Sequence, residues 1–314
     1  MAGILDSVNQ RTQLVGQNRL ELLLFRLQSK QIYGINVFKV KEVLQCPKLT
    51  LIPQRHPVIR GLAHIRGGTL PIMDMGLAIG QRPIPEEDIY NSFVIITEYN
   101  RKTQGFLVGG VERIVNLNWE EIHPPPKGAG RENYLTAVTE IDKKLIEIID
   151  VEKILSEVAP IEETLDSAFV EKATTKAAES DTKTVLIVDD SVVARKQIQN
   201  CLQTIGLNVV AKKDGREAFE YLHSLLEEGK DIGQEIALMI SDVEMPEMDG
   251  YTLTAKCKSD PRFDGLYIML HTSLSGVFNK AMVSKVGAND FMAKFSPDEL
   301  AERVMEIIDE RSSV

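Results

Sequence analysis

Short apolar runs separated by polar turns dominate the first half of the chain. The runs at residues 20–27 and 32–35 flank a polar segment at 28–31, which predicts a β-hairpin. Similar runs predict further strands at residues 50–52, 58–62, 69–72, 93–96, 105–108 and 145–149. Apolar spacing also predicts a docked helix within residues 1–18 and short helices at 37–44 and 151–158. Many short strands with regular turns favour an all-β sandwich or small-barrel architecture for this half.

The pattern changes near residue 160. Residues 160–183 contain few large apolar side chains, which predicts a linker that is partly helical because it is rich in Ala and Glu. From residue 184 apolar runs alternate with amphipathic segments, and strands are predicted at 184–188, 207–211, 236–241, 267–271 and 289–293. This alternation predicts a parallel sheet with helices on both faces. A last helix is predicted to start at Pro297 with Ser296 as its N-cap.

Composition and charge narrow the class of protein. The chain has 314 residues and a formal net charge of −10, which argues against a nucleic-acid-binding protein because such proteins carry a basic surface. Its cysteines, Cys46, Cys201 and Cys257, are widely spaced and predict a reducing cytosol without a disulfide framework. No signal-peptide pattern and no run long enough to cross a bilayer are visible. We therefore expect a cytoplasmic protein without membrane insertion.

Carboxylates stand where two of the predicted parallel strands end. The run 185–188 ends in Asp189 and Asp190, and the run 239–241 ends in Asp242. Ligands of open α/β sheets bind at the carboxyl ends of the strands. Three carboxylates at such short distances repel one another, and they cannot all stay ionised unless a cation binds between them. A site with only oxygen ligands favours a hard cation such as Mg²⁺. The pattern predicts a magnesium-assisted phosphoryl site.

Further residues at predicted strand ends carry a resemblance to a known family. Asp189-Asp190-Ser191 follows the first strand, Asp242 the third, Thr272-Ser273 the fourth and Lys294 the fifth, and residues 245–250 read Met-Pro-Glu-Met-Asp-Gly. In these motifs the second half resembles the response-regulator receiver domain of the CheY-like family. The resemblance implies a flavodoxin-like α/β fold with a five-stranded parallel sheet and helices on both faces.

The resemblance also implies roles for the acidic residues. Asp242 would be the phosphoacceptor, whose carboxylate attacks phosphorus in line and becomes an aspartyl phosphate. Asp190 and Asp242 would bind Mg²⁺ directly, together with the backbone carbonyl of Glu244, and Asp189 would hold the ion through water. The alternative is that these aspartates are ordinary solvated residues at strand ends and have no function. We would favour this alternative for a single aspartate but not for the whole set.

The remaining roles concern the phosphoryl group and its effect. By the resemblance, Lys294 would neutralise charge on the phosphoryl oxygens, the Thr272 hydroxyl would bond one of them, and Phe291 would be the aromatic switch. The sequence departs from the family at Phe295, where proline is usual. Our hypothesis for Glu244, two residues after the phosphoacceptor, is that its charge tunes the lifetime of the aspartyl phosphate.

The first half resembles a second family, the CheW chemotaxis coupling proteins. The resemblance rests on Tyr33-Gly34-Ile35, on residues 40–43 and 71–74, and above all on Gly-Leu-Ala-His-Ile-Arg-Gly at 61–67. It implies two small β-barrels side by side and no catalytic chemistry. It also implies docking onto chemoreceptors and onto the chemotaxis histidine kinase.

Three residues of this half match surface positions of the CheW family. They are Val40, Glu42 and Arg66, and we expect Arg66 to pair with Glu42 and to orient a partner interface. The alternative is an ordinary surface ion pair, which contributes little to stability.

The order of these segments resembles the CheV family. We expect an N-terminal helix at 1–18, a coupling domain at 19–158, a linker at 159–183 and a receiver at 184–314. The protein would be a chemotaxis adaptor, and not an enzyme beyond its own phosphorylation, that joins receptors to the histidine kinase and is regulated by phosphoryl transfer to Asp242.

Alternatives stay open beside this interpretation. The receiver could act mainly as a phosphate sink. A transcriptional response regulator is disfavoured by the acidic balance and because no helix-turn-helix pattern follows the receiver. A haloacid-dehalogenase-type phosphohydrolase needs its nucleophile and acid two residues apart at the first strand, whereas Asp189 and Asp190 are adjacent.

Overall fold

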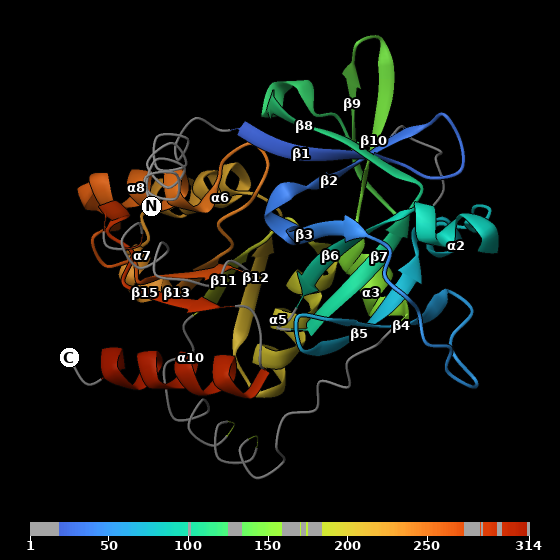
Figure 1. Ribbon diagram of the computed structural model, residues 1–314. Helices are drawn as coiled ribbons and strands as arrows, with labels where there is room; N and C mark the ends of the chain where they lie inside the picture. Colours follow the sequence, from blue (N-terminus) through green and yellow to red (C-terminus); the bar gives the residue numbers. More distant parts are fainter. Residues whose placement is uncertain are drawn as a thin grey trace, which may run out of the picture. The chain divides into compact units, whose positions relative to one another are not determined.

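The chain folds into two compact units (Figure 1). The computed structural model describes residues 19–99, 102–124, 134–158, 170, 174, 184–272, 283, 285–293 and 297–312. The first unit contains elements β1 to α3 and the second contains β11 to α10. The helix predicted within residues 1–18 lies outside the described residues, as does most of the predicted linker.

The first unit contains two five-stranded sheets. One has the order β8-β1-β2-β10-β9, with β1 (Arg19–Arg26), β2 (Ile32–Asn36), β8 (Gly110–Asn118), β9 (Leu135–Ile141) and β10 (Lys144–Ile149). The other has the order β3-β6-β7-β5-β4, with β3 (Val40–Gln45), β4 (Ile59–Ile65), β5 (Gly68–Asp74), β6 (Phe93–Tyr99) and β7 (Lys102–Val108). The short helical elements are η1 (Val37–Lys39), α2 (Met75–Ala78), η2 (Glu86–Asn91), η3 (Trp119–Glu121) and α3 (Val151–Val158).

Isolated bridges join the opposite edges of each sheet. His123, which follows β8, exchanges two backbone hydrogen bonds of 2.8 Å with Val138 on the opposite edge strand β9. Thr50, which follows β3, pairs in the same way with Leu62 on the opposite edge strand β4. Each sheet therefore curves into a small barrel around its own apolar core, as predicted.

Tight turns fix the register of two hairpins in this unit. Asp142 and Lys143 connect β9 to β10 with φ values of 51° and 60°, and Arg66 and Gly67 connect β4 to β5 with φ values of 49° and 82°. Positive φ at both central residues is the signature of the type I′ turn, whose twist matches that of the flanking strands. Arg66 consequently stands at the tip of a hairpin.

The structure corrects part of the prediction for this unit. The helix predicted at 37–44 is wrong, because only η1 is helical there and β3 follows it. The β-branched Val40 and Val43 favour an extended chain, and pairing of β3 with β6 decides the outcome. The run at 50–52 contributes only the bridge of Thr50, while β8 and β9 were not predicted. The helix predicted at 151–158 is confirmed as α3.

The second unit is a parallel sheet in the order β12-β11-β13-β14-β15. Its strands are β11 (Thr184–Val188), β12 (Asn208–Lys212), β13 (Ile236–Ser241), β14 (Ile268–Thr272) and β15 (Asp290–Ala293). The helical elements are α5 (Val192–Thr204), α6 (Gly215–Glu227), α7 (Ile232–Glu235), α8 (Gly250–Ser259), η4 (Pro261–Phe263) and α10 (Pro297–Ser312). If the five strands are numbered in chain order, their spatial order across the sheet is 2-1-3-4-5. This is the flavodoxin-like order, so the predicted fold is confirmed.

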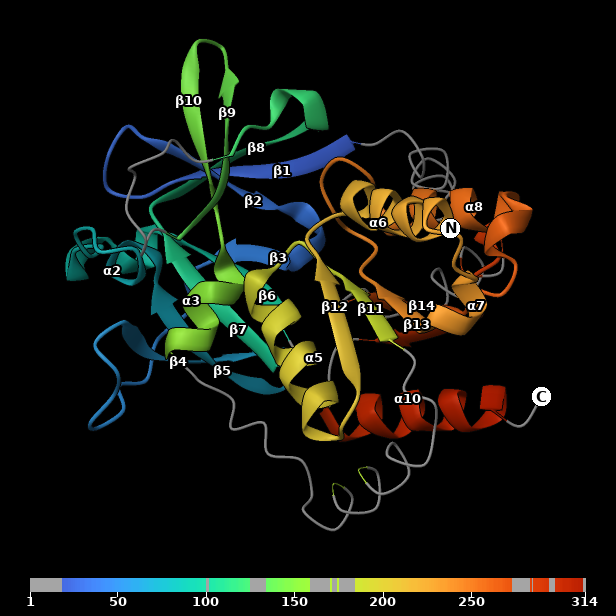
Figure 2. The same ribbon diagram turned by 180° about the vertical axis from the view of Figure 1, so that it is seen from behind.

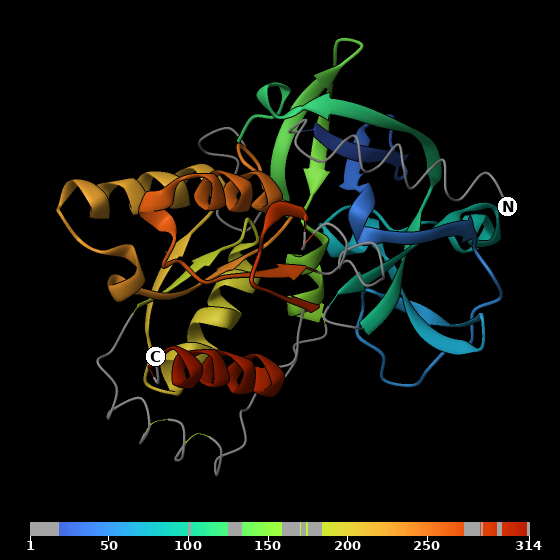
Figure 3. The same cartoon turned by 90° about the vertical axis from the view of Figure 1, so that its left-hand side faces the viewer.

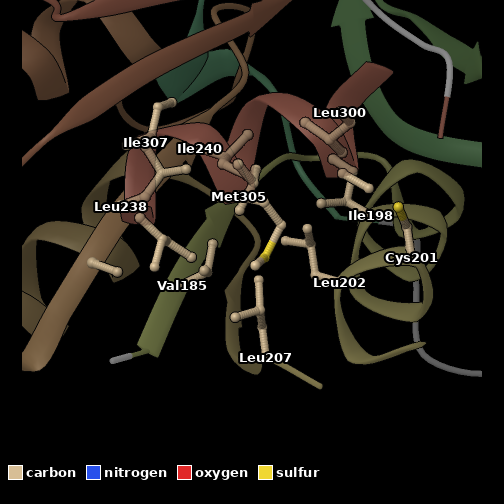
Figure 4. Packing of buried hydrophobic residues seen from close by; sticks show 14 of the residues in the cluster. Val185, Ile198, Cys201, Leu202, Leu207, Leu238, Ile240, Leu300, Met305 and Ile307 are labelled. Carbon is tan, nitrogen blue, oxygen red and sulfur yellow. The ribbon is translucent and has the colours of Figure 1, made fainter. Parts of the chain in front are cut away.

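Helices cover both faces of this sheet (Figures 2 and 3). Because side chains alternate along a strand, Val185 and Ile187 of β11 both pack against α5 and α10. Figure 4 shows Val185 among the apolar side chains of these helices. Leu186 and Val188 point to the opposite face and pack against α6 and α8. Burial on both faces explains the uninterrupted apolar run of β11, and it leaves only the strand ends for polar chemistry.

Candidate functional site

The register of two neighbouring strands brings the predicted carboxylates together. Val188 at the end of β11 pairs with Ser241 at the end of β13, so the next residues, Asp189 and Asp242, emerge side by side. The backbone N–H of Asp242 donates to the carbonyl of Val188 at 2.7 Å. One carboxylate oxygen from each of Asp189, Asp190 and Asp242 lies within 4.8 Å of the others. The predicted convergence of these three residues is confirmed.

Backbone N–H groups orient two of the carboxylates. Val243 donates to Asp242 Oδ1 at 2.7 Å, and Ser191 donates to Asp189 Oδ1 at 2.8 Å. The Ser191 hydroxyl in turn caps α5 by accepting from the N–H of Ala194 at 3.2 Å. The start of α5 and the position of Asp189 are thus set by the same turn.

Burial makes this cluster costly unless a cation joins it. The exposed fractions of Asp189 and Asp242 are only 1% and 6%, and Asp190 is half-buried. Like charges in a partly dry site repel each other strongly. Three carboxylates with converging oxygens are a hard donor set, which fits the oxygen coordination that Mg²⁺ prefers. The donor chemistry of the site therefore fits the predicted ion.

The loop between β13 and α8 wraps tightly over the backbone of Asp242. Gly250 donates its N–H to the carbonyl of Val243 at 2.9 Å, and a Cβ at position 250 would stand 2.0 Å from the carbonyl oxygen of Asp242. Only glycine permits this approach. Asp249 before it caps α8 through the N–H of Thr252 at 2.8 Å. The loop that carries Glu244 is consequently held at both ends.

A buried phenol lies beside the cluster. Tyr251 is 6% exposed and packs with Val243, Leu270 and the half-buried Phe291. Burial raises the pKa of Tyr251 to about 12, and the negative charges of Glu244, Asp249 and Asp242 add to the effect. The predicted switch residue thus packs against an apolar cluster that includes Val243, the residue after the phosphoacceptor position.

Comparison with known proteins gives the same two halves. Residues 21–159 match the model of the CheW-like domain, and residues 185–305 match that of the response regulator receiver domain. Over 309 residues the chain is 31% identical to chemotaxis protein CheV3 of Helicobacter pylori, covering 94% of this chain and 96% of CheV3. The chain belongs to the CheV family.

Shorter relatives align with one half each of this CheV-family chain. Chemotaxis protein CheW of Klebsiella aerogenes is 29% identical over 156 residues, which cover 49% of this chain and 90% of that protein. Chemotaxis protein CheY1 of Helicobacter pylori is 34% identical over 122 residues, which cover 38% of this chain and 92% of that protein. The predicted combination of an all-β CheW-like domain with an α/β receiver is confirmed.

Other predicted site residues of this CheV-family receiver are only partly described. Thr272 is the last residue of β14, and its backbone pairs with Ala293, the last residue of β15. The side chain of Thr272 lies outside the described residues, as do Lys294 and Phe295. Backbone pairing nonetheless puts position 272 at the same end of the sheet as the carboxylates.

Sequence reasoning missed three residues that shape the site. The Arg195 guanidinium donates to the carbonyl of Asp189, Gly250 allows the tight loop, and Tyr251 belongs to the cluster against which Phe291 packs. Arg195 lies four residues after the cap Ser191, a helical spacing that returns it to the first turn. Gly250 stood in the quoted motif, but nothing in one sequence shows that a carbonyl lies against it.

The expected ion pair of the CheW-like domain is present. Arg66 Nη2 lies 2.6 Å from Glu42 Oε1, and the side chains are 79% and 30% exposed. Glu42 and Val40 lie on β3, an edge strand in the order of its sheet. The pair joins the β4–β5 hairpin to that strand.

Among the described residues, no helix is both long and apolar enough to cross a membrane.

Proposed function

We propose that this chain is a cytoplasmic chemotaxis adaptor that works at receptor arrays. Its coupling domain, residues 19–158, joins chemoreceptors to the chemotaxis histidine kinase. Its receiver, residues 184–314, follows a linker at 159–183 and is phosphorylated at Asp242. The proposal is carried by the convergence of Asp189, Asp190 and Asp242 within 4.8 Å.

The receiver chemistry follows from the orientation of Asp242. Its carboxylate attacks the phosphorus of a kinase phosphohistidine, the P–O bond forms, and the P–N bond breaks with its electron pair returning to the imidazole nitrogen. The Val243 N–H bond of 2.7 Å to Oδ1 holds the carboxylate in place during attack. When bound, Mg²⁺ neutralises charge on the transferring phosphoryl oxygens. Asp190, Asp242 and the Glu244 carbonyl would hold it directly, and Asp189 through water.

Thr272 and Lys294, assigned from the sequence, complete the proposed site. The Thr272 hydroxyl bonds one phosphoryl oxygen, and the Lys294 ammonium bonds another. The charge of Glu244 tunes how long the aspartyl phosphate lasts. Phosphorylation changes the charge beside Val243, and the packing of Val243, Tyr251 and Phe291 carries that change to the surface.

The coupling half of the proposal rests on its likeness to CheW proteins. Over residues 21–159 the chain matches the CheW-like domain, and the aligned Klebsiella aerogenes relative is named chemotaxis protein CheW. Val40, Glu42 and Arg66 would form part of the partner interface. The ion pair between Arg66 and Glu42 fixes the hairpin tip against β3 and so presents a defined surface.

Phosphotransfer from a phosphorylated chemotaxis histidine kinase tests the proposal. We expect the wild-type chain to accept the labelled phosphoryl group from the kinase. Asp242→Asn should reduce this phosphoryl transfer by roughly 100-fold or more because the nucleophile is gone. Asp264→Asn is the matched control, since Asp264 is an exposed receiver aspartate outside the cluster. Uptake by Asp242→Asn at the wild-type rate would refute the assignment. Steady turnover of small phosphate esters without the kinase would favour a phosphohydrolase instead.

A further inference from the structure

A pocket opens on the first barrel, in the CheW-like unit and not in the receiver. Its volume is about 350 Å³, at the lower end of the range of small-molecule sites. Its floor is apolar and consists of Leu24, Ile32, Ile141 and Ile146, all of which belong to or pack against the core of that barrel. Strands β1, β2, β9 and β10 each contribute one of these apolar residues, so the pocket lies against the core of the barrel.

The rim of the pocket is charged. It is formed by Glu112 and Arg113 on β8 and by Asp142 and Lys144 on the β9–β10 hairpin. Both acidic side chains already face an arginine: Asp142 lies 2.7 Å from Arg113, and Glu112 lies 2.9 Å from Arg26. The acidic charges of the rim are thereby neutralised within the protein.

Lys144, the remaining cation of the rim, forms no ion pair with another described residue. In the part of the chain that the structure describes, its ammonium group takes part in no hydrogen bond and no ion pair. One cation without a counter-charge, placed above an apolar floor, is complementary to a molecule with an aliphatic body and a terminal negative charge.

We propose that this pocket binds short aliphatic carboxylates. The hydrocarbon chain lies on Ile32, Ile141 and Ile146, and the carboxylate accepts a hydrogen bond from the Lys144 ammonium group. The hairpin that carries Lys144 is held by the type I′ turn at Asp142 and Lys143, so the backbone at position 144 is fixed beside the pocket. This site is independent of phosphorylation at Asp242.

Titration of the full-length protein with hexanoate, octanoate and octylamine tests the site. Calorimetry gives the affinities, and isoleucine methyl shifts in NMR spectra locate the ligand. Each added methylene should strengthen binding about fourfold while the pocket has room. Octylamine should bind at least ~10-fold more weakly than octanoate, because its charge is repelled by Lys144.

Two lysines of one hairpin give a matched pair of variants. Lys144→Gln should weaken octanoate binding roughly five- to tenfold, whereas Lys144→Arg should retain most of it. Lys143→Gln should leave the affinity unchanged, because Lys143 is exposed in the same turn but does not line the pocket. Equal affinities for octanoate and octylamine, or equal effects of the two Gln variants, would overturn the assignment, as would the lack of methyl shifts at millimolar octanoate.

Discussion

The two units of this chain place their polar groups in different ways. In the receiver, parallel register brings Asp189 and Asp242 together at strand ends, and the carboxylates meet one another. In the CheW-like unit, several charged side chains lie against an opposite charge, as in the pair of Lys39 and Glu152 at 3.0 Å. A cluster of like charges is stabilised when a ligand of opposite charge binds, whereas in an ion pair the two charges already compensate each other. The first arrangement fits the phosphoryl site proposed for the receiver, and the second fits the partner surface proposed for the barrels.

Gly250 of the receiver permits the close approach of its loop to the backbone of Asp242. A methyl group at position 250 would collide with the backbone of Asp242, so we expect Gly250→Ala to shift the loop and lower the free energy of unfolding of the receiver by about 3 kcal/mol. The displaced loop should also weaken Mg²⁺ binding. Thermal unfolding with and without Mg²⁺ measures both effects.

Gly110→Ala is the matched control for this prediction. Gly110 lies on β8 of the first barrel, and an added Cβ would find its nearest neighbour, Arg26 Nη2, at 3.8 Å. We expect a change of less than about 1 kcal/mol in the first unit and none in Mg²⁺ binding. If the two alanine variants behave alike, tight wrapping of Asp242 is not what Gly250 provides.

Each unit contains a buried phenol whose pKa is raised by burial. The pKa of Tyr251 is raised to about 12 by burial and by nearby carboxylates, so the folded receiver holds this proton more tightly than the unfolded chain. The resulting stability is fully present below pH 10 and is lost as the pH rises through about 12. It amounts to at most about 2.7 kcal/mol.

Tyr251→Phe removes the titrating hydroxyl, so this residue no longer contributes to the pH dependence of the unfolding free energy. We expect the unfolding free energy of the variant to fall less steeply than that of wild type between about pH 10 and 12. Tyr33→Phe is the corresponding variant of the first unit, where burial raises the pKa of Tyr33 and Gln81 bonds its hydroxyl at 2.5 Å. Parallel pH profiles of wild type and Tyr251→Phe would contradict the prediction.

Much of the receiver could be predicted because its signals are local. Continuous apolar runs mark strands buried on both faces, and each run stops where chemistry begins, as at Asp189 and Asp242. The closeness of the aspartates then follows from parallel pairing. The contact of Gly250 with the Asp242 carbonyl and the cluster of Val243 and Tyr251 depend on the path of a loop, which local pattern does not specify.

The first unit was harder to predict because its strands depend on pairing partners. The segment 37–44 has helix-like apolar spacing, but β6 offers a hydrogen-bonding edge and converts most of it into β3. In β8, residues such as Glu112 and Arg113 interrupt the apolar alternation, so the strand carries little sequence signal. The bridge between His123 and Val138 joins residues far apart in the chain, and no local pattern indicates it.

Asp190→Asn tests whether repulsion shapes the receiver site. Removing one of three converging carboxylates should raise the unfolding free energy without Mg²⁺ by about 1 kcal/mol. With saturating Mg²⁺ the wild type should gain more stability than the variant, because the variant binds the ion more weakly. The order of the two melting temperatures should therefore reverse on addition of Mg²⁺, whereas Asp264→Asn should follow the wild type in both conditions. A variant that is less stable than wild type without the ion would show that repulsion is not dominant.

The smallest expected change in stability concerns the ion pair at the hairpin tip. Arg66 is 79% exposed, so Arg66→Ala should lower the unfolding free energy by less than about 0.5 kcal/mol. If the surface of Val40, Glu42 and Arg66 binds partners, the same variant should weaken capture of the full-length protein by receptor–kinase arrays several-fold. Lys41→Ala is the control, because Lys41 lies on the same strand and pairs with Glu98 on β6. Equal capture of both variants would leave Arg66 an ordinary surface ion pair, while selective loss with Arg66→Ala would show that an interaction almost neutral for folding can matter for assembly.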